Sequence, residues 1–314
     1  MKAFFLTAGF ATRFRPYSEI VPKPMMPFMG MPLMLYTYEF LKEAGVDTAI
    51  FNLHHQAEKM RLGVLEYIKD SNLIFSLEEP NILGSGGALL YAKKYLNEDF
   101  FLANGDEVFF PDPINLNSLY EQHINEKRLA TFFCTEHPQA GKEFGALWLD
   151  DANVVRDIGK EKFQAGLKAK HYVGMAILSP EIFHGQDTRD CNILYDILYP
   201  HLASKRLYAE NLKMEWFEMG NAKSYLEAHG LVASKWNHFS QNALFQKMMA
   251  KYLSSATIDT RNGVHISYGA NQEIRKQGFS YLAKGIDTAS IRSLNNAIVI
   301  GRSAETEIEN QIII

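Results

Sequence analysis

The chain has 314 residues, 47% of them hydrophobic and 22% charged, and a formal net charge of -4. This length fits one large α/β domain with an extension or two modest domains, and such a chain buries about 75% of its extended surface on folding. Because the net charge gives no overall attraction to nucleic acid or to anionic lipid, we expect neither nucleic acid nor a membrane as a partner.

The two cysteines, Cys134 and Cys191, lie far apart and lack the spacing of metal ligands. They predict packed thiols in a reducing compartment rather than a disulfide framework or a zinc site. The first residues lack the long apolar region and the cleavage site of a signal peptide. No stretch approaches the roughly 20 apolar residues that cross a bilayer, so we expect a cytoplasmic protein.

Short apolar runs alternate with amphipathic stretches over the first two thirds of the chain, a pattern typical of β-α units around a mainly parallel sheet. A long loop rich in Gly and Pro follows the first run and extends to about residue 32. The functional loops should lie at the carboxyl ends of the strands. The pattern predicts strands at residues 2–7, 48–53, 73–77 and 100–103, and helices at residues 33–44, 54–68 and 85–95.

From residue 129 the apolar runs are joined by shorter connections, which predicts a mixed extension of the sheet with flanking helices. Beyond residue 237 the pattern becomes less regular. We therefore predict one α/β domain at residues 1–236 and a C-terminal extension at residues 237–314, in which a helical linker precedes a tail of strands or β-helix-like turns. The elements expected before that boundary are strands at residues 130–135, 145–149, 154–158, 172–178 and 216–218, and helices at residues 193–202 and 222–236.

The C-terminal extension ends in apolar residues at short intervals, in segments 297–301 and 306–314. These segments resemble short turns of a left-handed, hexapeptide-type parallel β-helix. Such repeats bury their core only by stacking, and the turns are too few for a free-standing solenoid. An edge strand or a homodimer contact is an equal alternative. Unpaired Ile312, Ile313 and Ile314 would favour association.

The strongest functional signal is the loop after the first predicted strand. Small residues there expose successive backbone N–H groups that can surround an anion, and Arg13, Arg15 and Lys23 add full positive charge. The loop matches neither the P-loop pattern nor the spaced glycines of a dinucleotide-binding turn. Phosphate is therefore the expected ligand, and the alternative is a turn with solvated basic residues. The residues expected around it are Ala8, Gly9, Phe10, Ala11, Thr12, Arg13 and Lys23.

Residues 7–16 and 22–30 together resemble the signature of the sugar-1-phosphate nucleotidyltransferases. That signature is a strand followed by Ala-Ala-Gly-x-Gly-Thr-Arg-Leu-x-Pro and then by Pro-Lys-Pro. The resemblance implies a Rossmann-like core of the GT-A-like kind, in which Arg13 grips the nucleoside triphosphate and Lys23 contacts the reacting phosphate. Ala11 stands where a second Gly is common, which is costly if its φ angle is positive.

A second segment, residues 79–88, resembles the family segment that borders the nucleobase. The resemblance implies that small residues here let a planar base lie against the backbone. Alternatively, Gly84 merely starts a helix that Ser85 caps, and both roles can coexist. The residues implied at the nucleotide are Asn81, Gly84, Ser85 and Gly86.

Two acidic residues are candidates for binding Mg²⁺. Asp106 ends an Asn-Gly-Asp triplet that follows an apolar strand and resembles the same triplet of the family. Mg²⁺ prefers a few carboxylate oxygens together with substrate phosphates, although an isolated triplet of this kind is more often a turn. Residues 216–221 resemble the family's Trp-x-Asp-x-Gly-Thr. Glu218 therefore takes the place of the second metal-binding aspartate and is one methylene longer.

The expected binding site for the acceptor, a sugar 1-phosphate, depends on two further segments. Residues 144–146 and 172–181 resemble the segments that line and close the sugar pocket of the family. Between them the family often carries Glu-Lys-Pro, where the Glu binds sugar hydroxyls and the Lys binds the sugar phosphate. This chain has Gly-Lys-Glu-Lys at residues 159–162, which offers a lysine but no obvious sugar-binding glutamate. The acceptor residues implied are Asn104, Gly145, Lys160 and Gly174.

The resemblance implies an enzyme that transfers a nucleotidyl group from a nucleoside triphosphate to a sugar 1-phosphate, with Arg13, Lys23 and Asp106 as catalytic residues. The tail favours mannose-1-phosphate guanylyltransferase. Alternatives are N-acetylmuramate-1-phosphate uridylyltransferase, glucose-1-phosphate thymidylyl- or uridylyltransferase, and phosphocholine cytidylyltransferase. From another class, a non-catalytic regulatory subunit that binds nucleotide-sugar is favoured by Ala11, Glu218 and the missing glutamate.

Overall fold

The computed structural model describes residues 1–314 except 161–165, 269–273, 285, 288, 290, 301–304 and 306. The described residues form two compact units, one made of Met1–Gly9 and Thr37–Trp216 and the other of Phe10–Tyr36 and Phe217–Ile314. Within the described ranges, no helix is long and apolar enough to cross a membrane.

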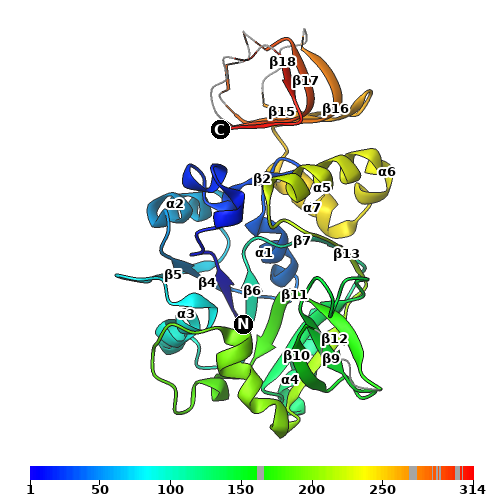
Figure 1. Ribbon diagram of the computed structural model, residues 1–314. Coiled ribbons are helices and arrows are strands. Elements are labelled where there is room, and N and C mark those ends of the chain that lie inside the picture. The colour runs from blue at the N-terminus through cyan, green and yellow to red at the C-terminus, as the bar shows by residue number, and fades with distance from the viewer. Residues whose placement is uncertain are drawn as a thin grey trace. The chain divides into compact units, whose positions relative to one another are not determined.

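The first unit is built on a sheet whose centre is parallel. β1 (Lys2–Leu6) pairs in parallel with β4 (Thr48–Leu53) on one side and with β6 (Phe100–Asn104) on the other, and β5 (Asn72–Leu77) continues beyond β4. Because these strands are nearly continuous runs of apolar residues, they suit a sheet that is covered on both faces. The four strands lie where the sequence predicted them (Figure 1).

An antiparallel strand extends this sheet and makes it mixed. β11 (Lys168–Leu178) pairs with β6 and also with β8 and β9, and all three pairs are antiparallel. The described part of the sheet has nine strands, and the predicted mixed, mainly parallel α/β fold is confirmed. The remaining strands are β8 (Ala130–Thr135), β9 (Ala146–Leu149), β10 (Val155–Gly159) and β12 (Leu207–Asn211).

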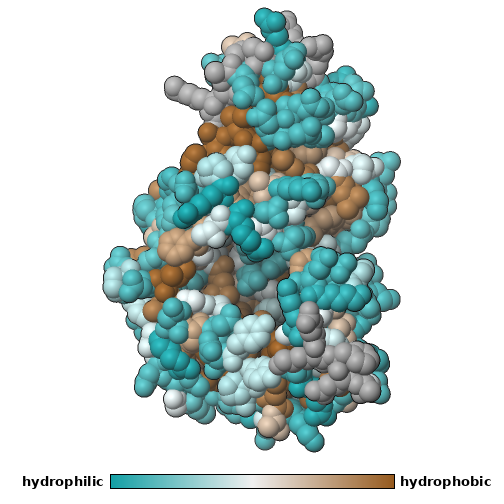
Figure 2. Space-filling model, viewed as in Figure 1, coloured by the Kyte–Doolittle hydropathy of each residue, from teal (hydrophilic) through white to brown (hydrophobic). Residues whose placement is uncertain are grey.

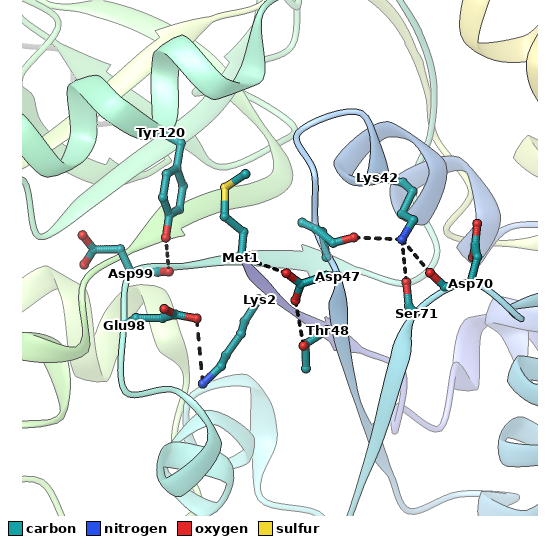
Figure 3. Close-up of polar contacts among 11 residues, drawn as sticks. Met1, Lys2, Lys42, Asp47, Thr48, Asp70, Ser71, Glu98, Asp99 and Tyr120 are labelled. Atoms are coloured by element: carbon teal, nitrogen blue, oxygen red, sulfur yellow. Dashed lines mark hydrogen bonds and ion pairs between the residues drawn. The ribbon is translucent and has the colours of Figure 1, made fainter.

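The amino ends of the strands are held by polar contacts (Figure 3). The N-terminal ammonium group lies 3.1 Å from a carboxylate oxygen of Asp47. Lys42 Nζ donates to the Asp70 carbonyl and to Ser71 Oγ, each at 2.9 Å. These contacts occupy the amino edge of the sheet, whereas Asn104 and the start of the predicted phosphate loop lie at its carboxyl edge.

Helices and short turns connect the strands, and apolar residues of segments 84–92 and 193–202 pack with the strands in a buried core. The expected helix at residues 193–202 is instead a π-helical segment, Ile193–Leu198, followed by a 3-10 segment, Tyr199–Ser204. Pro200 lacks the N–H that an α-helix would need there. The helices are α1 (Met34–Lys42), α2 (Ala57–Tyr67), α3 (Gly84–Ala92) and α4 (Leu116–Asn125).

Several elements were not predicted from the sequence. β7 (Val108–Pro111) begins two residues after the Asn-Gly-Asp triplet and pairs with β13 (Met214–Phe217). α4 begins after Asn115, whose side chain accepts a hydrogen bond from the backbone N–H of Ser118. The viewed face in Figure 2 is mostly hydrophilic, as expected when the apolar residues of the strands are buried.

In the second unit, a tight hairpin packs on a helix. β2 (Pro27–Phe28) and β3 (Met31–Pro32) are joined by Met29 and Gly30, both with positive φ. The Phe28 ring lies 4.4 Å from the ring of His229 in α5 (Ala222–Ser234). Atoms of Leu253, Ile266 and Tyr281 lie 3.1–3.4 Å from where a Cβ on Gly30 would stand. Two further helices are α6 (Trp236–Phe239) and α7 (Ala243–Tyr252).

The C-terminal strands stack in parallel. β15 (Gly263–Ser267) pairs with β16 (Arg275–Leu282), which pairs with β17 (Ser293–Val299), and β17 pairs with both β18 (Glu307–Glu309) and β19 (Ile312–Ile313). β14 (Thr257–Asp259) runs antiparallel to β15. This stacking of parallel strands, drawn in orange and red in Figure 1, is that of β-helix-like turns.

Beyond residue 237 the structure is more regular than the sequence pattern, with α7 followed by the stacked strands. The short polar strands carry few apolar residues each, so their periodicity is weak in the sequence. Ile312 is 5% exposed and belongs to β19, which pairs with β17. The apolar segment that would favour association if it were unpaired is therefore paired within the chain. Of the predicted turns, residues 301 and 306 lie outside the described residues.

Candidate functional site

The carboxyl end of β1 starts the predicted phosphate loop in the first unit. Leu6 pairs with Asn104 across β1 and β6, and its carbonyl accepts a hydrogen bond of 3.0 Å from the N–H of Gly105. Ala8 is buried, whereas Gly9 has no atom within 4 Å of where a Cβ would stand. The start of the loop and the turn that contains Asp106 thus leave the same edge of the sheet, the edge at which open α/β sheets bind ligands.

The predicted base segment lies at the beginning of α3 in the same unit. A Cβ on Gly84, which has φ +68°, would lie 2.7 Å from the carbonyl oxygen of Cys191, and one on Gly86 would lie 2.9 Å from Cys191 Sγ. The N–H of Gly86 donates to the same carbonyl at 2.8 Å. These glycines are therefore required by the close approach of the chain around Cys191. Asn81 lies on the exposed loop before α3.

The interpretation of Ser85 as the cap of this helix is wrong. α3 begins one residue earlier, at Gly84, and its N-cap residue Leu83 makes no side-chain cap bond. Ser85 Oγ instead accepts a 3.0 Å hydrogen bond from the N–H of Ile193. Ser85 thus fixes a distant segment to the first turn of α3.

Asn104, Gly174 and Glu107 come together where β6 ends beside β11. Met175 pairs with Ala103 across these strands. Gly174 has φ +73°, and a Cβ there would lie 2.6 Å from Asn104 Nδ2 and 2.7 Å from Glu107 Oε1. Asn104 Nδ2 donates to Glu107 Oε1 at 2.9 Å. Two predicted acceptor residues therefore meet around a carboxylate that the sequence analysis had not identified.

Glu107 also connects to a group of aromatic rings. Its Oε2 accepts a 2.8 Å hydrogen bond from Trp216 Nε1, and the Trp216 ring lies 4.3 Å from the ring of His171. Phe144 lies 5.3 Å from His171 and 5.9 Å from Trp216, measured between ring centroids. The residue after Phe144 is Gly145, so a predicted acceptor residue borders these rings.

His171 is buried among these rings, and within the described residues neither of its ring nitrogens has a hydrogen-bond partner. Burial, together with a smaller effect of the nearby His137, lowers the pKa of His171 to about 4. The imidazole is therefore neutral at pH 7. Lys160 is exposed just after β10, and residues 161 and 162 of its predicted cluster lie outside the described residues.

In the second unit, the rest of the predicted phosphate loop forms short helical turns. Ala11 has φ 46° and ψ 47°, the left-handed conformation, and precedes the 3-10 turn Thr12–Phe14. Its carbonyl accepts hydrogen bonds from the N–H of Phe14 at 2.8 Å and from Ser18 Oγ at 3.0 Å. Ala11 thus has the positive φ at which alanine is less favourable than glycine, because a left-handed conformation costs an L-residue about 1–2 kcal/mol.

Lys23 is almost buried, with 8% of its surface exposed. It starts the 3-10 turn Lys23–Met25, and prolines stand on both sides of it. A proline fixes its own φ, and it restricts the residue before it. The Pro-Lys-Pro sequence therefore holds the lysine backbone in a defined conformation. Phe10 is one of several exposed residues of the loop, with 40% of its surface accessible.

Arg13 and Glu218 converge on Gly220 in the second unit. A Cβ built on Gly220 would lie 2.0 Å from Glu218 Oε1 and 3.0 Å from Arg13 Nη1. The predicted triphosphate-binding arginine and one predicted metal-binding carboxylate therefore lie over the same bare stretch of backbone. Across the described residues, no group of at least three His, Cys, Asp or Glu side chains is arranged to hold a metal ion.

A mixed α/β sheet whose first strand leads into a predicted phosphate loop, with an acidic turn at the same carboxyl edge, is typical of nucleotide-binding proteins. The nucleotidyl transferase family matches residues 2–235 of the chain. The chain therefore belongs to the nucleotidyl transferase family, which confirms the resemblance found in the sequence.

Relatives of known name cover most of this chain. Mannose-1-phosphate guanyltransferase 2 of Candida glabrata is 30% identical over 241 residues, which are 74% of this chain and 64% of the relative. UTP–glucose-1-phosphate uridylyltransferase of Synechocystis sp. is 28% identical over 251 residues, which are 73% of this chain and 62% of the relative. The chain thus spans less than two thirds of the length of these relatives.

Solved structures share the fold. HddC from Yersinia pseudotuberculosis, crystallised as a complex with GMP-PN, has a TM-score of 0.59 and 24% sequence identity, over 73% of this chain and 97% of that chain. UDP-glucose pyrophosphorylase complexed with UDP-glucose has a TM-score of 0.59 and 22% identity, over 74% of this chain and 98% of that chain. At this level of identity the likeness establishes the fold alone.

Proposed function

We propose that the chain is an enzyme that transfers a nucleotidyl group from a nucleoside triphosphate to a sugar 1-phosphate. A phosphate oxygen of the sugar 1-phosphate attacks the α-phosphorus, the bond to the β-phosphate oxygen breaks, and pyrophosphate leaves with that oxygen. The products are a nucleoside diphosphate sugar and pyrophosphate. The observation that carries this proposal is the family match over residues 2–235, which contains the loop, the acidic turn and Glu218.

Catalysis of this reaction requires the alignment of two polyanions and the neutralisation of their charge. We assign the β- and γ-phosphates to Arg13 and the α-phosphate to Lys23. Backbone N–H groups of Ala8, Gly9, Phe10, Ala11 and Thr12 would contribute further donors. Asn81, Gly84, Ser85 and Gly86 are assigned to the nucleobase, and because the N–H of Gly86 already bonds to the Cys191 carbonyl, Gly86 would contribute contact surface.

A divalent metal is expected of the family, and we propose Mg²⁺ with Asp106 and Glu218 as its protein ligands. The residues fit a metal held largely by substrate phosphate, because Mg²⁺ is commonly bound through one or two carboxylates. Asp106 is half-buried at the end of β6, and Glu218 lies beside Gly220. When bound, the ion would neutralise the charge that develops on the phosphates.

For the acceptor we propose Asn104, Gly145, Lys160 and Gly174, with Glu107 as the carboxylate that binds sugar hydroxyls. The support for Glu107 is its 2.9 Å contact with Asn104 and its proximity to Gly174. Mannose 1-phosphate and a guanosine triphosphate are the preferred pair, since relatives in Candida glabrata and Arabidopsis thaliana carry the name mannose-1-phosphate guanylyltransferase or guanyltransferase. Glucose 1-phosphate with a uridine or thymidine triphosphate, and N-acetylmuramate 1-phosphate with a uridine triphosphate, are the alternatives.

We also propose that residues 1–236 carry the chemistry and that residues 237–314 form an extension, with the tail as a candidate homodimer contact. The free thiols of Cys134 and Cys191 support a cytoplasmic location. Sedimentation of the whole chain and of a variant that ends before β17 would test the dimer contact. If the number of chains per particle is the same for both, the tail is not the dimer contact.

The decisive experiment measures pyrophosphate release with a panel of nucleoside triphosphates and sugar 1-phosphates. We expect Lys23→Ala and Asp106→Ala to lower turnover by orders of magnitude while the protein stays folded. Lys223→Ala and Asp151→Ala are matched controls, because these side chains are 85% and 90% exposed. Wild-type turnover in Lys23→Ala or Asp106→Ala would refute the assignments. Nucleotide-sugar binding without turnover would instead favour the regulatory-subunit alternative.

A further inference from the structure

Two buried polar residues, Asn52 and Glu78, lie at the carboxyl edge of the sheet in the first unit and have no role in the chemistry above. Asn52 is in β4 and is 4% exposed, and Glu78 follows β5 and is 0% exposed. A carboxylate is rarely buried to this degree unless its oxygens are hydrogen-bonded. The partners of both side chains are therefore informative.

The two side chains form a continuous hydrogen-bonded connection. The N–H of Thr7 donates to Asn52 Oδ1 at 2.6 Å, and Asn52 Nδ2 donates to Glu78 Oε1 at 2.7 Å. The N–H of Leu83 donates to Glu78 Oε2 at 2.7 Å. Thr7 Oγ1 also donates to the Asn52 carbonyl at 2.6 Å. The connection thus runs from the first residue of the phosphate loop to the residue before α3.

The direction of every hydrogen bond in this connection is fixed. The Thr7 N–H can only donate, so Asn52 must turn its oxygen to Thr7 and its amide N–H groups to Glu78. The Leu83 N–H can only donate as well, so both carboxylate oxygens of Glu78 act as acceptors. The pKa of Glu78 is raised overall, because burial raises it by more than the hydrogen bonds from Leu83 and Asn52 lower it. Hydrogen bonds between buried groups are stronger than exposed ones, because the surroundings have a low dielectric constant.

We propose that Asn52 and Glu78 are positioning residues that hold the triphosphate side and the base side of the nucleotide site at a fixed spacing. One end of the connection orients the peptide plane between Leu6 and Thr7, directly before Ala8 and Gly9. The other end closes residues 78–83, which contain Asn81, and orients the start of α3. A nucleotide must contact both segments at once, so their spacing decides how much of its binding energy is realised. This inference rests on the proposed function.

The connection can be tested by reversing its polarity. Asn52→Asp places a carboxylate oxygen against Glu78, and Glu78→Gln gives position 78 a single acceptor for two donors. In the double variant the new amide at position 78 donates to the new carboxylate at position 52, and its oxygen still accepts from the Leu83 N–H. The Thr7 N–H keeps its acceptor as well. Asn52→Asp combined with Glu78→Gln therefore restores every hydrogen bond.

We expect each single variant to raise the dissociation constant and the KM for the nucleoside triphosphate at least about tenfold and to leave the KM for the sugar phosphate within about twofold. The double variant should recover most of the loss. A matched control is available in the second unit, where Asn295 Nδ2 donates to Glu309 Oε1 at 2.9 Å in an exposed pair. Asn295→Asp and Glu309→Gln should leave nucleotide binding unchanged.

Urea unfolding of all variants separates positioning from stability. The proposal is overturned if the single variants are folded and bind nucleotide as the wild type does, or if the double variant is no better than the single ones. The proposed transfer reaction fails separately if the wild type binds a nucleoside triphosphate but releases no pyrophosphate, and the connection is then judged by the dissociation constants. A wild type that binds no nucleoside triphosphate refutes both.

Discussion

Gly220→Ala is the sharpest test of the arginine and carboxylate pair, because the structure predicts a local displacement with little loss of stability. The added Cβ would stand 2.0 Å from Glu218 Oε1, whereas such contacts are essentially never shorter than 3.0 Å. The carboxylate must therefore retreat by about 1 Å or more. Because Oε1 is the far end of a flexible side chain, the retreat is inexpensive for folding. Arg13 Nη1, at 3.0 Å, must shift by a few tenths of an ångström.

The functional effect should greatly exceed the effect on stability. A misplacement of about 1 Å in a group that aligns substrate lowers the rate about 100-fold, which corresponds to about 2.7 kcal/mol of transition-state stabilisation. We expect Gly220→Ala to lower kcat/KM by about this factor and to raise the Mg²⁺ concentration needed for half-maximal rate. Steady-state pyrophosphate release, measured over a range of Mg²⁺ concentrations, gives both quantities.

Gly230→Ala is the matched control. Gly230 lies within α5, and its nearest atom to an added Cβ is Phe279 Cε1 at 3.9 Å, an ordinary contact. Alanine inside a helix is favoured over glycine by about 1 kcal/mol, so this variant should be more stable than the wild type and equally active. If Gly220→Ala retained wild-type kcat/KM and Mg²⁺ dependence, the assignment of Glu218 and Arg13 to the reaction would be wrong.

Further predictions concern strain, buried charge and the acceptor. Ala11→Gly removes about 1–2 kcal/mol of left-handed strain but increases the conformational entropy of the unfolded chain by about 0.4–1 kcal/mol, so urea unfolding should show a net gain in stability of about 0.5–1 kcal/mol. Ala250→Gly, at an exposed position of α7, should instead lose about 1 kcal/mol, and equal losses in the two variants would contradict the strain argument. His171 has its pKa lowered to about 4, so the unfolded state gains the proton between pH 6.5 and 4 and stability falls as the pH falls through that window. His171→Phe should flatten this dependence of the urea midpoint, and an unchanged slope would contradict it. Glu107→Gln leaves one acceptor for the donors Asn104 and Trp216, so the KM for the sugar phosphate should rise about tenfold with the KM for the nucleotide unchanged; the reverse pattern would exclude the acceptor role.

The central sheet was predictable because its strands are apolar on both faces. β1, β4, β5 and β6 are nearly continuous apolar runs, and such runs need no alternation to be identified as buried strands. The short strands β7, β12 and β14 and the helix α7 offer weaker patterns, and they owe their formation to pairing with distant segments. The sequence pattern indicates the preference of each segment by itself and does not show which distant segment it will pair with.

The same distinction applies to the candidate site, where residues in local motifs were predictable and residues defined by distant contacts were not. Motif residues such as Asn104 and Gly174 were identified because their types and order match a known signature, and the register of β6 and β11 brings these two together. Glu107 was overlooked, although an acidic residue directly after the Asn-Gly-Asp triplet was a visible signal. His171, Asn52 and Glu78 carried no local signal, because their importance arises from contacts with residues far away in the sequence.

Two residues depart from the family signature, Ala11 and Glu218, and the contacts around each explain how the fold accommodates it. Ala11 keeps a strained left-handed conformation because Phe14 and Ser18 both donate to its carbonyl, and strain persists in a fold only where neighbouring contacts determine the conformation. Glu218 is longer than the aspartate of the signature, and its carboxylate lies where any side chain at position 220 would stand. The absence of a Cβ at Gly220 therefore makes room for the longer acid. Substitution at Gly220 tests that compensation directly, whereas Glu218→Asp alone would shorten the acid and leave the space unfilled.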